Sequence, residues 1–555
     1  MSLQQEMRRY RTDDDVDFVI VGSGAAGGVL AKELATAGFS VVVLEQGPYL
    51  RPFEFKHDEL DDFFVGGLIG SLRDHPHSWR QRPTDDAVPA SLMPQLFYAK
   101  AVGGSSLHFA ANYWRFRPVD FMERSILGPI SGSTLVDWPL TYEELEPYYT
   151  KVDWEVGVSG APGPGDPPRS RPYPTPPMYA KSAGVLMRRG AEALGWTSAP
   201  APVAILSQPH NGRAACINCG YCWGHGCEVG AKSSTLASMI PVAEATGNCE
   251  IRDRSVVHRI EVDAADRVRR VVYLDPDGVE QAQRTKAVIL AANGAETPRL
   301  LFLSESSRHP DGLANSSGKV GKNLMFNTNS TAIGVFPEPL NEYKGVMATR
   351  VMMDFYETDP ARGFYGGGGI DARSTLGHLF FAMFEGLHPD EPTWGPEFKR
   401  RMAHSYTRHA NFMGHGTSLP MERNSITLDP ELKDAWGRAA IRVTYEDHPD
   451  DVALHRFMQA RGMELLEAAG AEEIFGPTPG VSTVAAHFLG TCRMGDDPAE
   501  SVVDRYHRSH DVANLFICDG SSLVTSGRGQ PTMTIQALAF RAGEHIAESA
   551  GRGEI

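Results

Sequence analysis

The stretch Asp17-Phe-Val-Ile-Val21-Gly22-Ser-Gly24-Ala-Ala-Gly27-Gly28 decides the fold of the N-terminal part of the chain. The short β-branched run before Gly22 predicts a buried strand, and Val29 to Ala37 has the composition of a helix. Ser40 to Leu44 predicts a second strand, which Glu45 ends. A Gly-x-Gly-x-x-Gly turn between a strand and a helix indicates a dinucleotide-binding fold. A glycine-rich turn in an unrelated sheet is the alternative.

Each position of this turn has a physical reason. Gly22 permits the tight turn, Gly24 lets the backbone approach a pyrophosphate, and Gly27 lets the helix and the strand pack closely. The N-terminus of the helix faces the phosphates. Glu45 is placed to accept hydrogen bonds from a ribose. The cofactor-binding residues expected in this segment are Gly22, Gly24, Ala25, Ala26, Gly27 and Glu45.

Composition restricts the class of protein. The 555 residues are 42% hydrophobic and 22% charged, as in an ordinary globular protein, and the net charge is −16. Nucleic-acid binding is not expected, because no cluster of Lys and Arg is present. The sequence has no apolar run long enough to span a bilayer. Met1 to Asp17 lacks the apolar region of a secretory signal, so we expect a cytoplasmic protein, or a periplasmic one that is exported with a partner.

Three further segments point to FAD as the dinucleotide. Val102-Gly103-Gly104-Ser105-Ser106 is a turn of small side chains suited to close contact with a flat ring. Lys286 to Ala292 predicts a strand, which Asn293-Gly-Ala-Glu-Thr-Pro-Arg-Leu-Leu301 follows. The C-terminal part carries Leu515-Phe-Ile-Cys-Asp519-Gly520 and then Gln530-Pro-Thr-Met-Thr-Ile535.

With these motifs the sequence resembles the glucose–methanol–choline (GMC) oxidoreductase family. The resemblance also includes Val320-Gly-Lys-Asn-Leu324 and His487-Phe-Leu-Gly-Thr-Cys-Arg-Met-Gly495, and the motifs occur in the family's order from residue 17 to about residue 547. Within the family the chain is most similar to the flavoprotein subunits of bacterial sugar and polyol dehydrogenases, such as gluconate, fructose and glucose dehydrogenases. The resemblance implies an α/β fold, in which an FAD-binding Rossmann-like domain is interleaved with an α+β substrate domain built on an antiparallel sheet.

The expected domains are discontinuous. Residues 1–50, 90–150, 232–320 and 485–555 would form the FAD-binding domain, and 321–484 the substrate-binding domain. Residues 151–231 would form a Pro-rich arm and a cysteine segment. Ser159 to Met178 is too rich in Pro and Gly for a helix or a central strand, so we expect an extended surface arm.

The resemblance implies that His487 is the catalytic base, a role for which imidazole is well matched. The family's second catalytic position is usually His or Asn but here is Gln530, which can position a substrate hydroxyl and cannot act as a base. His108 lies where some relatives join a His covalently to the flavin and others only pack it against the ring. Further expected cofactor-binding residues are Gly103, Gly104, Ser105, Ser106, His108, Asn112, Asp519, Gly520, Pro531 and Thr532.

Four cysteines lie within one short segment: Cys216, Cys219, Cys222 and Cys227. Cys-x2-Cys-x2-Cys on one loop is typical of an iron–sulfur cluster, of either three or four irons. A structural zinc site, disulfides and free thiols are the alternatives.

The sequence therefore predicts FAD-dependent oxidation of an alcohol group in a sugar, polyol or glycoside. Electrons would leave through the iron–sulfur cluster to a cytochrome, and a small export or assembly subunit is a further expected partner. An oxidase that uses O₂, a dehydrogenase of aromatic or lignin-derived alcohols, and a flavin-bearing lyase or electron carrier are the rival hypotheses.

Overall fold

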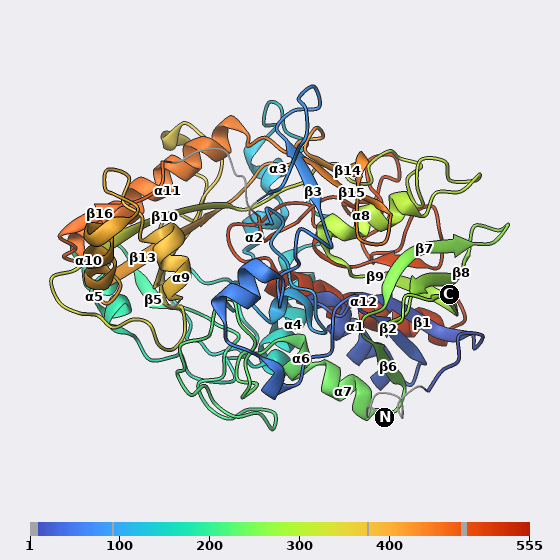
Figure 1. The fold of residues 1–555 in the computed structure, drawn as a ribbon. Helices are drawn as coiled ribbons and strands as arrows, with labels where there is room; N and C mark the ends of the chain where they lie inside the picture. The colour runs from blue at the N-terminus through green and yellow to red at the C-terminus, as the bar shows by residue number, and fades with distance from the viewer. Residues whose placement is uncertain (1–8, 92–93, 375–376, 479–484) are drawn as a thin grey trace.

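The fold is taken from a computed structural model that describes residues 9–555, apart from 92–93, 375–376 and 479–484. Residues 1–8, which belong to the Met1–Asp17 segment used for the expectation about a secretory signal, lie outside the described residues. Figure 1 shows a sheet with helices α1 and α12 at one end of the molecule and a second sheet with helix α11 at the other. Within the described ranges, no helix is long and apolar enough to cross a membrane.

The first sheet has the order β6-β2-β1-β9-β8-β7, and β17 also pairs with β9. Five of its strands run parallel: β1 (Val16–Val21), β2 (Val41–Leu44), β6 (Cys249–Arg252), β9 (Glu280–Leu290) and β17 (Leu515–Ile517). Strands β7 (Val256–Val262) and β8 (Val268–Leu274) extend β9 as an antiparallel meander. β2 and β17 are buried throughout, and burial of both faces explains their continuous apolar runs.

Helices cover this sheet and complete the dinucleotide-binding fold. α1 (Ala25–Thr36) packs against α12 (Thr532–Gly551), which packs against α4 (Tyr142–Val152). The strand, glycine turn, helix and second strand predicted from the sequence are confirmed, but the helix begins at Ala25, inside the glycine motif and before the predicted start at Val29. Further helices are α2 (Pro118–Phe121), α3 (Glu123–Leu127), α6 (Thr235–Ser238), α7 (Ile240–Ala245) and α8 (Asn293–Leu303).

The register of the parallel strands brings distant residues to one edge. Val21 of β1 pairs with Leu44 of β2 and with Leu290 of β9, and Leu290 also pairs with Ile517 of β17. Parallel strands end at the same edge of a sheet, so Gly22, Glu45 and Asp519 emerge there together. In open α/β sheets this edge is where ligands bind.

The second sheet is antiparallel, with the order β16-β10-β13-β12-β11-β5, and confirms the expected substrate-domain architecture. One face packs on α11 (Pro449–Ala468) through residues such as Ala332, Ala372 and Phe412. The alternate residues, on the other face, carry polar side chains. Asn329 of β10 pairs with His415 of β13, and Asp371 and Arg373 lie on β12, which also pairs with β13. Its strands are β5 (Ser198–Pro200), β10 (Thr328–Val335), β11 (Ala348–Met352), β12 (Gly368–Arg373), β13 (His409–Gly416) and β16 (Glu473–Phe475).

A third sheet has the order β14-β15-β3-β4, with β3 (His77–Arg80), β4 (Val88–Pro89), β14 (Ser425–Lys433) and β15 (Ala439–Thr444). Residues 151–231 contribute α5 (Ser182–Ala193) and β5 to the substrate region. The Pro-rich stretch has isolated β-bridges in place of regular strands, from Ser159 to Thr175 and to Val203. The exact domain boundaries stay a prediction. The remaining helices are α9 (His378–Phe380) and α10 (Gly395–Ser405).

Candidate active site

A cavity of ≈ 480 Å³ extends from the edge of the parallel sheet to the polar face of the six-stranded sheet. It brings together most residues predicted from the sequence: Gly22, Gly24, Ala25, Ala26, Glu45, Gly104, Ser105, Ser106, His108, Asn112, His487, Asp519, Gly520, Gln530, Pro531 and Thr532. Gly27 and Gly103 are not among its lining residues. A Cβ on Gly27 would lie 2.0 Å from the carbonyl oxygen of Gly22, so the role of Gly27 is the close packing of helix and strand.

The nucleotide end of the cavity is built from two glycine turns pressed together. Gly22 has φ +94°, a left-handed conformation that favours glycine, and a Cβ on Gly104 would lie 2.7 Å from the Cα of Gly24. Glu45 accepts hydrogen bonds from the backbone N–H of Ser23 at 3.0 Å and from its hydroxyl at 2.7 Å. Burial raises the pKa of this carboxyl. The carboxylate therefore holds the first turn in place at the cavity wall.

Asp519, which follows β17, connects the end of this strand to the segment that follows β9. Its carboxylate accepts hydrogen bonds from the backbone N–H of Asn293 at 3.0 Å and from the Thr297 hydroxyl at 2.6 Å. Helix α12 begins nearby at Thr532, with Pro531 as its N-cap. The N-terminus of this 20-residue helix thus adds partial positive charge to the cavity wall.

Polar atoms without protein partners line the middle of the cavity. Neither ring nitrogen of His108 has a hydrogen-bond partner among the described residues, nor does Oδ1 of Asn112, although both side chains are buried. Burial, assisted by Lys232, lowers the pKa of His108 to about 3, so its imidazole is neutral. Buried polar groups normally have partners. These groups and the two glycine turns fit a bound dinucleotide with a polar ring system.

His487 is held in one tautomer by Asn327. The Nδ2 of Asn327 donates to the backbone carbonyls of Gly416, Ser526 and Gly527, each at 3.2 Å, so its Oδ1 must face His487. That Oδ1 lies 2.8 Å from Nδ1 of His487, which therefore carries the ring proton. Burial, assisted by His415, lowers the pKa of His487 to about 3. The ring is neutral, and Nε2 is its proton-accepting nitrogen.

Gln530 lies against a second histidine of the cavity. Its Nε2 is 3.0 Å from Nδ1 and 3.1 Å from Nε2 of His415. An atom at nearly equal distance from both ring nitrogens lies over the ring, because an in-plane position would collide with the carbon between them. Gln530 also lies beside His487, and its side chain raises the pKa of that imidazole against the effect of burial.

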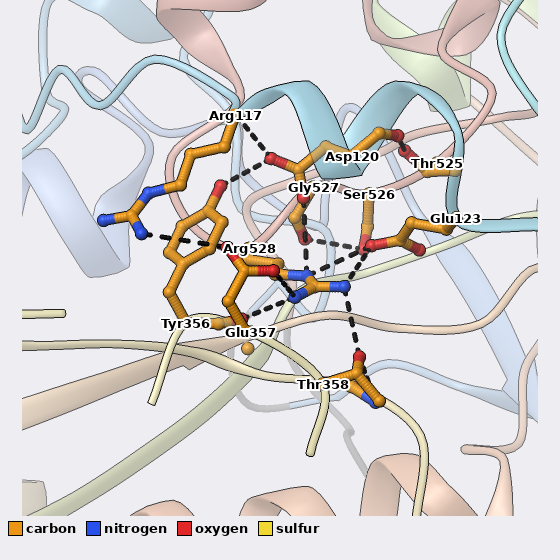
Figure 2. Close-up of polar contacts among 12 residues, drawn as sticks. Arg117, Asp120, Glu123, Tyr356, Glu357, Thr358, Thr525, Ser526, Gly527 and Arg528 are labelled. Atoms are coloured by element: carbon orange, nitrogen blue, oxygen red, sulfur yellow. Dashed lines mark hydrogen bonds and ion pairs between the residues drawn. The ribbon is translucent and has the colours of Figure 1, made fainter. Parts of the chain in front are cut away.

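A buried ionic cluster holds Arg528, two residues before Gln530 in the chain (Figure 2). Arg528 is completely buried, and its guanidinium donates to Glu123 at 2.6 Å and to the carbonyl of Tyr356 at 2.6 Å. Asp120 lies 3.4 Å from the same guanidinium and accepts a 2.5 Å hydrogen bond from the Tyr356 hydroxyl. Two acids around one arginine raise each other's proton affinity: burial, with Asp120 nearby, raises the pKa of Glu123 to about 7.

The cysteine segment does not fit a metal site in this structure. Cys216, Cys219, Cys222 and Cys227 are free thiols. Within the described ranges, no three side chains of His, Cys, Asp or Glu are grouped so that they could hold a metal ion. Burial raises the pKa of Cys222 to about 12, so a metal that bound there would have to displace the proton of this thiol.

The fold and the cavity define a dinucleotide-binding α/β protein with a neutral histidine beside the ligand space. Family models described as GMC oxidoreductase match residues 140–328 and 420–539, and one described as a NAD(P)-binding Rossmann-like domain matches residues 20–58. The chain belongs to the GMC oxidoreductase family and is an FAD-dependent oxidoreductase.

Several characterised proteins are similar over their full length. 2-Methyl-1,2-propanediol dehydrogenase of Mycolicibacterium austroafricanum is 35% identical, with 96% of this chain and 95% of that protein covered. The fructose dehydrogenase large subunit of Gluconobacter japonicus is 30% identical, with 97% and 98% covered. Formate oxidase of Aspergillus oryzae shares the fold, with a TM-score of 0.69 at 15% identity and with 98% and 100% of the chains covered.

Sequence reasoning missed one side of the cavity. We call it the polar wall: Asn329, Arg373, Glu385 and His415 line the cavity, and Asp371 lies behind them, bonded to Arg373 and His415. Asn327, which orients His487, was also missed. The only sequence signal was a run of alternate polar positions within strands of the second sheet, and such alternation does not distinguish a ligand-facing surface from a solvated one.

Proposed function

We propose that this protein oxidises an alcohol group of a sugar, polyol or glycoside, with His487 as the base. FAD, when bound, supplies the acceptor for the hydride that leaves the alcohol carbon, at its N5 atom. The FAD-holding residues would be those of the two glycine turns, together with Glu45, Asp519 and the start of α12. The chain's own contribution is to remove the hydroxyl proton and to hold the alcohol in place.

The orientation of His487 is the observation that carries this proposal. Asn327 accepts the hydrogen bond from Nδ1, so Nε2 has a free lone pair directed away from Asn327. The low pKa of the imidazole keeps it unprotonated at neutral pH, ready to accept a proton from a substrate hydroxyl. The amide of Gln530 lies beside it and can hydrogen-bond the same hydroxyl.

The polar wall supports a substrate with several hydroxyl groups. Asp371 and Arg373 form a buried ion pair, with Arg373 Nε donating to the carboxylate at 2.6 Å. Glu385 adds a carboxyl group whose pKa burial raises to about 7, so it can accept or donate a hydrogen bond near neutral pH. Relatives named for a diol and for fructose agree with this substrate class.

An aromatic alcohol is the second candidate, because Trp223 and Phe380 line the same cavity with their ring centroids 4.7 Å apart. Anaerobic reduction of the flavin by a panel of sugars, polyols and benzylic alcohols tests both. Reduction by the polyhydroxylated compounds supports the first candidate, and reduction by benzylic alcohols alone supports the second.

The route of the electrons after flavin reduction is a separate proposal. The cysteine spacing predicts an iron–sulfur cluster that hands electrons to a cytochrome, but the arrangement of the thiols gives it no support. One of the relatives is named as a large subunit, and another as paromamine 6'-oxidase of Streptomyces fradiae. Iron and acid-labile sulfide, measured on protein prepared without oxygen, test the cluster. Oxygen consumption during alcohol turnover tests the oxidase alternative.

A further inference from the structure

His415 is a buried histidine that the reaction described above does not use. It lies on β13, it is 1% exposed, and it lines the same cavity as His487 and Gln530. Both of its ring nitrogens have polar neighbours, and the single N–H of a neutral imidazole donates to one of them. Nδ1 lies 3.1 Å from Oδ1 of Asn329, and Nε2 lies 2.8 Å from Oδ2 of Asp371.

The partners of His415 are themselves fixed. Arg373 Nε donates to Asp371 Oδ1 at 2.6 Å, and Asn112 Nδ2 donates to Asp371 Oδ2 at 2.6 Å. Asn329 donates its Nδ2 to the Asn327 carbonyl at 3.1 Å, which directs its Oδ1 toward His415. The edge-on ring of Trp114, with its centroid 5.1 Å from that of His415, adds packing. The imidazole ring is therefore held in one orientation in the wall of the cavity.

Gln530 needs such a support more than the shorter residues usual at its position would. A glutamine side chain has one rotatable bond more than asparagine, and fixing it costs more conformational entropy. Its amide nitrogen lies over the His415 ring at 3.0 and 3.1 Å from the two ring nitrogens. This contact is made from a strand more than a hundred residues away in the sequence.

We propose that His415 is a positioning residue of the oxidation: its ring, fixed by Asp371 and Asn329, holds the amide of Gln530 beside His487. The proposal rests on the proposed function for its catalytic consequence, but the contact between the two side chains can be tested without turnover. It predicts an asymmetric dependence. Gln530 should lose its position when His415 is removed, whereas His415 should keep its position when Gln530 is removed.

Crystal structures of the FAD-bound wild type, H415A and Q530A test this dependence directly. We expect the Gln530 amide in H415A to leave its wild-type position or to occupy several rotamers, with His487 still bonded to Asn327. In Q530A the His415 ring should be unchanged. H415F, which keeps a flat ring, should retain the Gln530 position. N329A removes one partner of the His415 ring and should give a smaller displacement, which also provides the test if H415A does not fold. An unmoved Gln530 amide in H415A, or in N329A should H415A not fold, overturns the proposal.

A double-mutant cycle adds the kinetic consequence. The loss of one hydrogen bond costs roughly a factor of ten, so H415A should slow alcohol-driven flavin reduction by about that factor. The H415A/Q530A variant should be no slower than Q530A, since both changes remove the same positioned amide. H409A, the same substitution at the other end of β13 and outside the cavity lining, is the matched control and should leave the rate unchanged. If the rate losses of H415A and Q530A multiply in the double variant, the proposal is contradicted. If no alcohol reduces the wild-type flavin while Gln530 still moves in H415A, the proposed function fails and the positioning role stands.

Discussion

Oδ1 of Asn327 lies 2.8 Å from Nδ1 of His487, and this contact decides which ring nitrogen can accept a proton. Asn327 cannot turn its amide around, because its nitrogen donates to three backbone carbonyls. Two of these carbonyls, those of Ser526 and Gly527, belong to the same loop as Gln530. The proposed base, the residue that orients it and the second polar group of the site are thus fixed by one set of contacts.

Substituting Asn327 should damage catalysis without removing His487, the proposed base. N327A deletes the acceptor that selects the tautomer of His487, and the loss of a hydrogen bond worth about 1.4 kcal/mol corresponds to roughly tenfold slower flavin reduction. Stopped-flow measurement of flavin reduction by an alcohol, with FAD content as the control, checks this. A rate equal to that of wild type would show that another contact orients the ring.

The aspartate variant at the same position should change the pH dependence. The pKa of His487 is about 3 in the wild type, so its protonation should not reduce kcat/KM between about pH 5 and 8. A carboxylate at position 327 favours the imidazolium form and raises this pKa. N327D should therefore lose activity as the pH falls through the raised pKa and recover it as the pH rises. A pH profile for N327D that runs parallel to that of wild type would argue against Asn327 as the neighbour that controls His487.

Gln530 should tolerate an amide and not an apolar side chain. Q530N keeps a hydrogen-bonding group that can reach a substrate hydroxyl, so we expect activity to remain and even to rise on some substrates. Q530L keeps the approximate size and removes the hydrogen bonds, and we expect flavin reduction to slow by roughly tenfold or more. The comparison is made on KM and kcat separately. If Q530L matches the wild type in both, the amide has no role in positioning the alcohol.

Arg528 should be important for stability. R528M leaves the buried carboxylates of Glu123 and Asp120 without their cation, and breaking a buried ionic cluster in this way typically costs about 3–5 kcal/mol. Urea unfolding of the FAD-bound protein measures the loss. R528K keeps the charge but not the forked geometry, so it should be destabilised by less. Equal stability of R528M and wild type would mean that the cluster does not hold this loop.

Glu123 should give stability a measurable dependence on pH. Burial raises its pKa in the folded protein to about 7, from an ordinary value of 4.5. The folded state holds this proton more tightly than the unfolded chain, so the contribution of Glu123 is complete below about pH 4.5 and is lost as the pH rises through 7. In E123Q the free energy of unfolding should therefore fall less steeply between these values. If E123Q leaves the pH dependence of the free energy of unfolding unchanged, a group other than Glu123 binds this proton.

The nucleotide-binding half of the site could be predicted from sequence because its determinants are local. Gly22, Gly24, Gly27 and Glu45 lie within one strand–turn–helix–strand unit, and their spacing alone brings them to the edge of the sheet. The structure confirms that unit and the antiparallel substrate sheet. His487 and Gln530 were found through motifs of the family rather than through their geometry.

The polar wall could not be predicted, because it depends on register between strands. Asn329, Asp371 and His415 come from three strands separated by dozens of residues, and a shift of one residue would turn each side chain to the other face. The cysteine segment shows that a local sequence pattern can also fail to predict a site. Its spacing predicts a cluster, but burial and the local backbone decide whether four thiols converge, and those are properties of the folded loop.

The central claim is that His487 removes the proton of an alcohol while hydride leaves to FAD. Its most direct test is the anaerobic reduction of the bound flavin by a polyhydroxylated alcohol, followed by absorbance in wild type and H487A with equal FAD content. The wild-type flavin should bleach, and H487A should bleach roughly 10²–10⁴-fold more slowly, the usual cost of losing a general base. Bleaching of H487A at the wild-type rate would contradict it.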